Sequence, residues 1–406
     1  MIYFDSSATN PLLPVASSAM INAMNLSIKK SLGNPSSLHT PGSLGRDLLD
    51  SARSSIAQLL DCRKNEVIFT SGGSESNNTV IHTFEHCPIF VSAIEHPSVI
   101  KPAEEYGSPC VKIPVNEQGT IDIVFLKTNL LKVLEKDPRQ KILISVMFAN
   151  NETGVIEPIA KIIELIQLLK KEGHRNIFLH TDATQAIGKI PISTKNLCVD
   201  YLTCSSHKIG GPVGIGGLFV RSGTPFRPLI FGGAQENKRR AGTSNVVLAS
   251  GFAAAANYAL SHKTWELYAQ KIAPLRDYLA AKLSSRIPST KIISPLKSST
   301  EKDCCLPNIL SVSFPAAEGE STQLYLDLAG FAISTGSACA SGDLEPSHVL
   351  MAMFHDAEIA HGSIRFSFNL STKKKDVDTL LTALPAIVEK IQSISTLTVT
   401  KEPINE

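Results

Sequence analysis

"NIFLHTDATQAIGKIPISTKNLCVDYLTCSSHKIGG", residues 176–211, holds two apolar runs that each end in polar residues. Both runs have the length and apolar character of buried strands. Similar runs occur upstream, "EVIFT" at 66–70 and "KILISVMFA" at 141–149, and apolar stripes at helical spacing occupy 44–60 and 158–173. Strands that alternate with helices predict an α/β fold whose mostly parallel sheet is covered by helices on both faces.

The pattern changes after about residue 260, where short strands are interleaved with longer helices. The short strands are predicted at 307–314, 331–335 and 363–368. This arrangement indicates a smaller α+β domain. We therefore expect a large domain over 16–260, and a small domain formed by 1–15 together with 261–406.

The composition is that of a globular chain of 406 residues, 43% hydrophobic and 19% charged. Its formal net charge of +2 gives no reason to expect a nucleic acid or an anionic membrane as partner. No apolar run approaches the roughly 20 residues that span a bilayer. The first residues, "MIYFDSSATNP", lack the basic and apolar regions of a secretion signal, so we expect a cytoplasmic protein.

The chain has eight cysteines, none of them in a C-x-x-C pair, and their spacing does not predict a structural metal site. We expect reduced thiols. Cys339 differs from a packing cysteine because its neighbours in "STGSACASGDLEPSHVL", 334–350, are small. Either this predicted loop tolerates any small residue, or the thiol must reach a reaction partner.

Polar residues follow four of the predicted strands, and open parallel sheets bind ligands beyond the carboxyl ends of their strands. The four groups are Ser71–Ser74, Asn150–Glu152, Thr181–Asp182 with Gln185, and Ser205–Lys208. Gly72 and Gly73 open a predicted helix, whose free N–H groups suit a phosphate. Glycine turns between strand and helix are common, so this feature alone leaves a phosphate site open.

Lys208 follows a predicted buried strand and precedes a Gly-Gly-Pro turn. Lysine forms Schiff bases where its amine is neutral, and a surface lysine at a strand end is the alternative. Asp182 supplies the carboxylate that pyridoxal phosphate (PLP) enzymes place against the pyridine nitrogen. Together, the lysine, the carboxylate and a glycine turn that could bind a phosphate favour a PLP enzyme. His96 is either a structural histidine or a ring that stacks on the cofactor and moves protons.

A series of motifs resembles, in order from residue 3 to about residue 370, the NifS/IscS cysteine desulfurases. The motifs are "YFDSSATNP", "GNPSSLH", "FTSGGSESNN", "EHPSV", "NNETG", "TDATQAIGK", "SSHKIGGPVGIG", "RAGTSNV", "STGSACAS", "LEPSHVL" and "SIRFSF". These enzymes are class V, fold type I PLP-dependent transferases. The resemblance implies a large domain with a mostly parallel sheet of the seven-stranded type, a smaller α+β domain, and a homodimer.

The resemblance also implies roles for matching residues. Lys208 matches the lysine that holds PLP covalently, Asp182 the partner of the pyridine nitrogen, and Gln185 the donor to the phenolic oxygen. His96 matches the catalytic histidine stacked on the ring. The phosphate cup is matched by Gly73, Ser74, Ser205 and His207, with Thr243 reaching the cofactor of the neighbouring subunit. The positions matching the substrate-carboxylate site are Arg365, Asn34 and Asn151, the last also beside the cofactor.

Cys339 matches the nucleophile of these enzymes. The resemblance implies that its thiolate attacks the sulfur of L-cysteine, leaving L-alanine and a Cys339 persulfide. An iron–sulfur cluster scaffold protein is the expected acceptor, and other sulfur acceptors are alternatives. No resident metal is assigned, although Cys339 could transiently contact an iron–sulfur cluster. The form "STGSACAS" resembles the longer-loop group of the family, which favours delivery to a scaffold.

Several positions depart from the commoner family pattern without removing a chemical role. They are Asn10, Ser74, Ser206, Gly210 and Val213. Other readings of the chain are a selenocysteine lyase, which would use the same residues, and an aminotransferase, which does not need Cys339. A non-catalytic partner of a sulfur-transfer scaffold is a further alternative, disfavoured by the intact Lys208, His96, Asp182 and Cys339.

Overall fold

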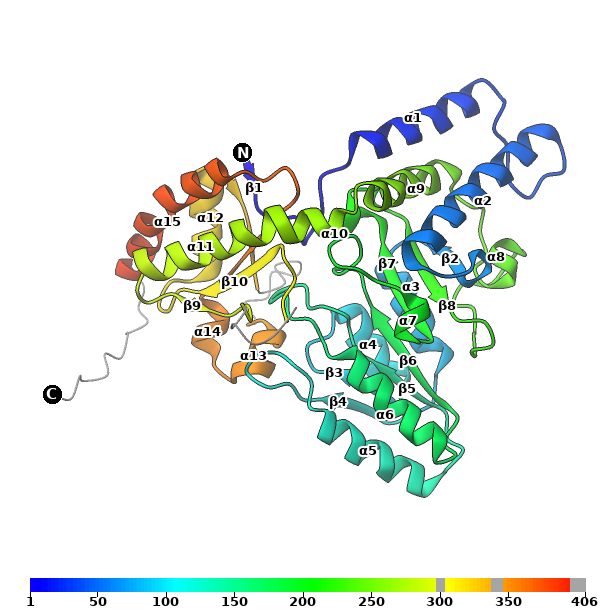
Figure 1. The fold of residues 1–406 in the computed structure, drawn as a ribbon, viewed down its shortest axis with the longest axis horizontal. Coiled ribbons are helices and arrows are strands. Elements are labelled where there is room, and N and C mark those ends of the chain that lie inside the picture. The colour runs from blue at the N-terminus through cyan, green and yellow to red at the C-terminus, as the bar shows by residue number, and fades with distance from the viewer. Residues whose placement is uncertain (297–303, 337–345, 395–406) are drawn as a thin grey trace.

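The larger part of the protein is built on one sheet in a computed structural model that describes residues 1–296, 304–336 and 346–394 (Figure 1). The described strands of this sheet are, in spatial order, β2 (Val67–Thr70), β8 (Gly216–Val220), β7 (Tyr201–Ser205), β6 (Ile177–Asp182), β5 (Ile142–Ser145), β3 (Ile89–Ser92) and β4 (Cys110–Ile113). β8 runs antiparallel to both of its neighbours, and the other pairs are parallel. The predicted mostly parallel sheet is confirmed.

Helices cover both faces of this sheet, because alternate side chains of each buried strand point to opposite faces. In β5, Ile142 and Ile144 belong to one apolar cluster and Leu143 to another. The first cluster includes side chains of α2 (Thr40–Leu60), α5 (Ile123–Lys136), α6 (Ile159–Lys171) and α9 (Val246–Ser261). The second includes side chains of α3 (Gly73–Thr83) and α4 (Pro97–Tyr106).

Shorter elements connect and flank these layers. They are η1 (Lys64–Glu66), α7 (Thr194–Leu197), η2 (Ser206–Ile209) and α8 (Gln235–Lys238). Helix α1 (Pro14–Ile28) packs against α9, on the outer side of the molecule (Figure 1). Gly251 of α9 leaves space for the Met20 side chain there, since a Cβ at Gly251 would lie 2.7 Å from Met20 Cγ.

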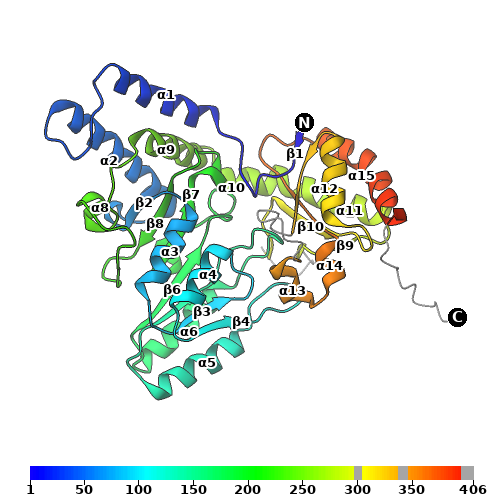
Figure 2. The ribbon, with the colours of Figure 1, turned by 180° about the vertical axis from the view of Figure 1, so that it is seen from behind.

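A second, antiparallel sheet forms the core of the remaining part (Figure 2). Its described strands are, in order, β12 (Ser334–Thr335), β13 (Ser363–Ser367), β10 (Ile309–Ser313) and β9 (Lys291–Ile292). Its apolar side chains pack with those of α11 (Ala273–Arg286), α12 (Gly319–Leu328) and α15 (Lys374–Ile394). The remaining helical segments are α10 (Thr264–Leu267), η3 (Tyr268–Ile272), α13 (His348–Phe354) and α14 (Ala357–His361).

The N-terminal residues join the two parts of the protein. Strand β1 (Ile2–Tyr3) pairs in parallel with β11 (Phe331–Ala332), and Asp5 pairs with Ser367 beside it. Residues 6–13 then cross from the small sheet to α1 (Figures 1 and 2). This crossing segment lies next to the site described below.

Two of the expected strands have other bounds in the structure. The run at 141–149 is a strand only to Ser145. The segment 331–335 was predicted as one strand, but β11 pairs with β1 while β12 pairs with β13. Each difference arises because strand pairing, which the apolar pattern does not encode, decides where a strand ends.

Candidate active site

A cavity of about 450 Å³ lies where the carboxyl ends of β6 and β7 face the small sheet. Ten of the residues predicted for the site line it: Gly73, Ser74, His96, Asn151, Asp182, Gln185, Ser205, His207, Lys208 and Arg365. They come from segments almost 300 residues apart in the chain. The fold therefore gathers the lysine, the acid, the glycine turn and the arginine at one place, as the polar strand ends predict.

Two other predicted residues do not line this cavity. Asn34 and Thr243 are exposed, and Thr243 lines a separate hollow beside Arg240. Cys339 lies outside the described residues, so its expected position stays a prediction. Gly336, the last residue described before it, lines the cavity.

Asp182 is the last residue of β6 and is held by two hydrogen bonds. Asn77 of α3 donates from Nδ2 to Asp182 Oδ2 at 2.8 Å, and the backbone N–H of Thr184 donates to Oδ1 at 2.8 Å. Asn77 Nδ2 also donates to Ser98 Oγ at 2.9 Å. A buried carboxylate in fixed orientation can hold a cationic or N–H group of a ligand in the cavity.

Lys208 lies on the η2 turn directly after β7. Its amine donates to the backbone oxygen of Ala8 at 2.8 Å and also to that of Ser7. Burial, reinforced by the positive charge of Arg365, lowers the pKa of Lys208 to about 8, while Asp182 acts in the opposite direction. A substantial fraction of the amine is therefore neutral near physiological pH and able to attack a carbonyl group.

His96 caps the N-terminus of α4 and faces the cavity. Its Nδ1 accepts from the Ser98 N–H at 3.1 Å and contacts Ser98 Oγ at 2.7 Å. Desolvation by the surrounding protein atoms lowers the pKa of His96, Lys208 lowers it further, and Asp182 opposes the shift. The neutral ring is thus fixed through Nδ1, which leaves its other nitrogen for proton transfer.

The turn into α3 offers backbone N–H groups to an anion. α3 begins at Gly73, and Ser74 adds a hydroxyl at the cavity wall. Strand β8 passes so close that a Cβ at Gly216 would lie 2.7 Å from Gly72 Cα. A free helix N-terminus with a hydroxyl beside it suits a phosphate group.

His207 and Gln185 complete the wall around Lys208. Burial, with the nearby charges of Lys208 and Lys189, lowers the pKa of His207 to about 4, so its ring is neutral. Its Nδ1 contacts Thr9 Oγ1 at 3.2 Å. Gln185 Nε2 donates to the Ser7 backbone oxygen at 3.0 Å.

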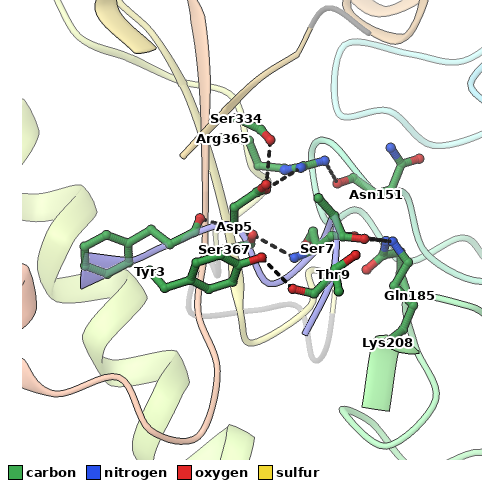
Figure 3. A network of polar contacts seen from close by, with 12 residues as sticks. Tyr3, Asp5, Ser7, Thr9, Asn151, Gln185, Lys208, Ser334, Arg365 and Ser367 are labelled. Carbon is green, nitrogen blue, oxygen red and sulfur yellow. Dashed lines mark hydrogen bonds and ion pairs between the residues drawn. The ribbon is translucent and has the colours of Figure 1, made fainter. Parts of the chain in front are cut away.

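Arg365 enters the cavity from β13 on the small sheet (Figure 3). Its NH1 donates to the Asn151 backbone oxygen at 3.0 Å, and its NH2 donates to Asp5 Oδ1 at 2.9 Å. The arginine therefore faces Lys208 across the cavity with donors to spare, since a guanidinium carries five N–H groups.

The chemistry of these donors fits PLP. Lys208 suits the aldehyde, Asp182 the pyridine nitrogen, and the N-terminus of α3 the phosphate. Several buried polar atoms also lack a hydrogen-bond partner among the described residues, as a polar ligand site requires. Those at the cavity are Ser7 Oγ, Asn77 Oδ1, Thr184 Oγ1, Gln185 Oε1 and Arg365 Nε.

The sequence reasoning missed several residues of the cavity. Asn77, Thr184 and Ser98 line the cavity and support Asp182 and His96. Ser7 lines it from the N-terminal crossing segment, and Asp5, which precedes that segment, contacts the cavity residue Arg365. The spacing of Asn77 four residues after Gly73, on one face of a predicted helix, was a usable signal. Nothing local indicated Asp5 or Ser7, whose partners are more than 170 residues away.

Among the described residues, no group of His, Cys, Asp and Glu side chains is arranged to hold a metal ion. In the same part of the chain, no helix combines the length and apolar character needed to cross a membrane.

Comparison with known proteins gives consistent results. The profile of the family described as "Aminotransferase class-V" matches residues 2–380. Cysteine desulfurase IscS of Dictyoglomus turgidum is 41% identical over 403 residues, 97% of this chain and 96% of the relative. Cysteine desulfurase IscS 1 of Archaeoglobus fulgidus is 38% identical over 98% of this chain and 99% of its own. The crystal structure of a NifS-like protein from Rickettsia africae superposes with a TM-score of 0.83, 32% identity, and coverage of 96% of this chain and 99% of that one.

Proposed function

This chain belongs to the aminotransferase class-V family, and we propose that it is a cysteine desulfurase, which converts L-cysteine to L-alanine and a persulfide on Cys339. The observation that carries the proposal is the single cavity that brings Lys208, Asp182 and Arg365 together. The two named cysteine desulfurases, 41% and 38% identical over nearly the whole chain, support the same activity.

PLP is the cofactor that this set of donors fits. Lys208 would hold its aldehyde carbon, Asp182 its pyridine nitrogen, and Gln185 its phenolic oxygen. Its phosphate would be held at the N-terminus of α3 by Gly73, Ser74, Ser205 and His207, all of which line the cavity. When bound, PLP supplies the electron sink that allows bonds at the α-carbon of an amino acid to break.

Arg365 binds the α-carboxylate of L-cysteine. Its planar fork suits a carboxylate, and Asn151 lies beside it through the contact between its backbone oxygen and NH1. Arg365 and Lys208 both line the cavity, so an amino acid held by its carboxylate presents its amino group towards the cofactor site. Asn34 is exposed in this structure, and we assign it an assisting role only on the resemblance.

Lys208 and His96 move the protons. Lys208 Nζ, with a pKa lowered to about 8, would take and hold the α-proton of the substrate. The free imidazole nitrogen of His96 serves the second proton transfer, since its Nδ1 is already held by Ser98. Burial keeps Lys208 able to act as a base near neutral pH. The neutral His96 ring accepts from Ser98 at Nδ1, so it carries its proton on Nε2 and can donate it.

Cys339 takes the sulfur. Its thiolate attacks the substrate sulfur, the new S–S bond forms as the Cβ–S bond breaks, and the electron pair of the broken bond is protonated to give the methyl group of L-alanine. The thiol of L-cysteine and the thiol of Cys339 thus yield one persulfide and one alanine, with no added oxidant. Gly336 lines the cavity, so the chain that leads to Cys339 starts at the site.

The persulfide is then passed to an acceptor, for which we propose an iron–sulfur cluster scaffold protein. We also propose a homodimer in which Thr243 reaches the partner subunit's cofactor. The exposure of Thr243 supports this role. Nearby in the chain, Arg240 Nε donates to Glu75 Oε1 of α3 at 2.9 Å, and this bond fixes the segment that carries Thr243. The free thiols among the described cysteines suit the cytoplasm, where we place the enzyme.

The decisive experiment adds L-cysteine to the PLP-loaded protein and locates bound sulfur by peptide mass spectrometry. We expect one additional sulfur atom on the Cys339 peptide and an equal amount of L-alanine. Cys339→Ala should abolish both, while Cys198→Ala, which removes an exposed thiol away from the cavity, should leave both unchanged. Keto-acid formation instead of persulfide would indicate an aminotransferase, and activity confined to L-selenocysteine would indicate a selenocysteine lyase. Absence of any product would indicate a non-catalytic partner.

A further inference from the structure

Asp5 contacts the arginine to which we assign the substrate carboxylate, and the proposed function gives it no role. Asp5 Oδ1 accepts from Arg365 NH2 at 2.9 Å and from Ser334 Oγ at 2.8 Å (Figure 3). The contact is largely buried, because the side chains of Arg365 and Asp5 are only 8% and 20% exposed. It therefore differs from a solvent-screened surface ion pair.

Strand pairing fixes this arrangement from three directions. Ser334 of β12 lies directly opposite Arg365 of β13 in the antiparallel register, so their side chains project from the same face. Asp5 is held between them because β1 pairs with β11 and Asp5 itself pairs with Ser367. The carboxylate is thus part of a rigid frame built from backbone hydrogen bonds.

The ion pair leaves the arginine able to bind a second carboxylate. Asp5 uses one oxygen on one nitrogen, NH2, and NH1 is used by the Asn151 backbone oxygen. Arg365 Nε has no partner among the described residues. An arginine with a flexible side chain would lose rotamer freedom on binding substrate, and a guanidinium that is already fixed loses less.

We propose that Asp5 is a positioning residue, which fixes the Arg365 guanidinium for the α-carboxylate of the amino-acid substrate. The inference rests on the proposed function, since it assigns that carboxylate to Arg365. Asp5 also balances charge, because it is paired directly with Arg365, a cation that shares the cavity with Lys208 and with the acidic residues Asp182 and Glu152. The opposite possibility is that Asp5 competes with the substrate for Arg365, and the two predict opposite changes in affinity.

The test compares two ligands that differ only in the carboxylate, L-alanine and ethylamine, by titration of the PLP-loaded protein. Asp5→Asn keeps the shape and an acceptor oxygen but removes the charge. We expect it to weaken L-alanine binding about tenfold, the effect of losing one charge-assisted contact, and to leave ethylamine binding unchanged. The KM for L-cysteine should rise by a similar factor, with kcat changed less than about threefold.

The matched control is Asp378→Asn, which removes an aspartate paired with Lys374 at 2.9 Å on α15, away from the cavity. It should leave both ligands unaffected. Ser334→Ala, which removes the other donor to Asp5 Oδ1, should weaken L-alanine binding by a smaller factor and serves if Asp5→Asn does not fold.

Three results would overturn the proposal. Tighter L-alanine binding by Asp5→Asn would establish competition, unchanged binding would remove Asp5 from the site, and equal weakening of both ligands would indicate general damage to the fold. If the wild-type protein binds L-alanine and Asp5→Asn weakens it, but no persulfide forms on Cys339, the positioning role stands and the desulfurase activity fails.

Discussion

Asn77 of α3 and Asp182 of β6, 105 residues apart in the chain, are joined by a hydrogen bond of 2.8 Å from Nδ2 to Oδ2. The bond links the helix at whose N-terminus we propose the phosphate to the carboxylate that we propose as partner of the pyridine nitrogen. One residue thereby fixes two ends of the proposed cofactor site relative to each other. The same amide donates to Ser98 Oγ, which contacts the Nδ1 of His96.

Asn77→Ala should weaken PLP binding by about tenfold, because Asp182 Oδ2 would lose its described donor inside a buried site. The measurement is a titration of cofactor-free protein with PLP, followed by its visible absorbance. Asn129→Ala is the control, since Asn129 donates only to its own helix, at the Phe125 backbone oxygen. Unchanged PLP affinity in Asn77→Ala would show that Asp182 needs no support from α3.

The pH dependence of PLP capture should follow the Lys208 amine. Burial lowers the pKa of Lys208 to about 8, so the neutral amine accumulates as pH rises through 8 rather than through the value near 10.4 of a free lysine. The rate at which cofactor-free protein forms the lysine-bound absorbance band should therefore reach half its maximum near pH 8. A midpoint near pH 10 would contradict the desolvated environment.

Arg365→Ala should move that midpoint to higher pH. The positive charge of Arg365 disfavours protonated Lys208, so removing the arginine raises the Lys208 pKa. The negative charge of Asp5 favours protonated Lys208, and without the arginine as its partner it raises this pKa further. The same capture assay measures the shift. A midpoint that stays in place would show that desolvation alone sets the pKa.

Gly216→Ala should disturb the turn at which we propose the phosphate to bind. The added Cβ would meet backbone atoms, Gly72 Cα at 2.7 Å and Cys204 O at 2.9 Å, which cannot move aside as a side chain does. We expect a loss of about 1–3 kcal/mol in the free energy of unfolding and weaker PLP binding. Gly217→Ala is the matched control, because its nearest neighbour is the Cys204 Sγ at 3.0 Å and it faces the other side of β8. Equal effects of the two variants would remove the close contact as the cause.

Arg53→Met should destabilise the fold by about 3–5 kcal/mol, because it leaves the buried carboxylate of Glu236 without its cationic partner. Glu236 accepts from both Arg53 NH1 and NH2, at 2.5 and 2.8 Å, and from the Phe69 N–H at 3.0 Å. Urea unfolding measures the change. The exposed pair of Lys64 and Asp50, at 3.4 Å, is the comparison, and Lys64→Met should change stability by less than about 1 kcal/mol. Similar losses from both variants would contradict the buried character of the Arg53 pair.

The sequence by itself determined the fold class and most of the chemistry of this protein. Apolar runs that end in polar residues predicted the parallel sheet. Its geometry requires that Asp182, at the end of β6, and Lys208, just after the adjacent β7, meet at one edge. Motifs supplied the roles proposed for both residues. They also predicted Cys339 as the nucleophile, which lies outside the described residues.

Only the tertiary structure decided what surrounds those residues. The surrounding protein atoms bury Lys208 and lower its pKa. The Asn77 bond to Asp182 and the Asp5 bond to Arg365 each join segments more than 100 residues apart. Such contacts depend on strand register and on the path of residues 6–13 between the sheets, which local side-chain patterns do not encode. The residues beside Asp5 in the sequence do not predict a contact with Arg365. The pairing of β1 with β11 brings the Asp5 carboxylate to the arginine.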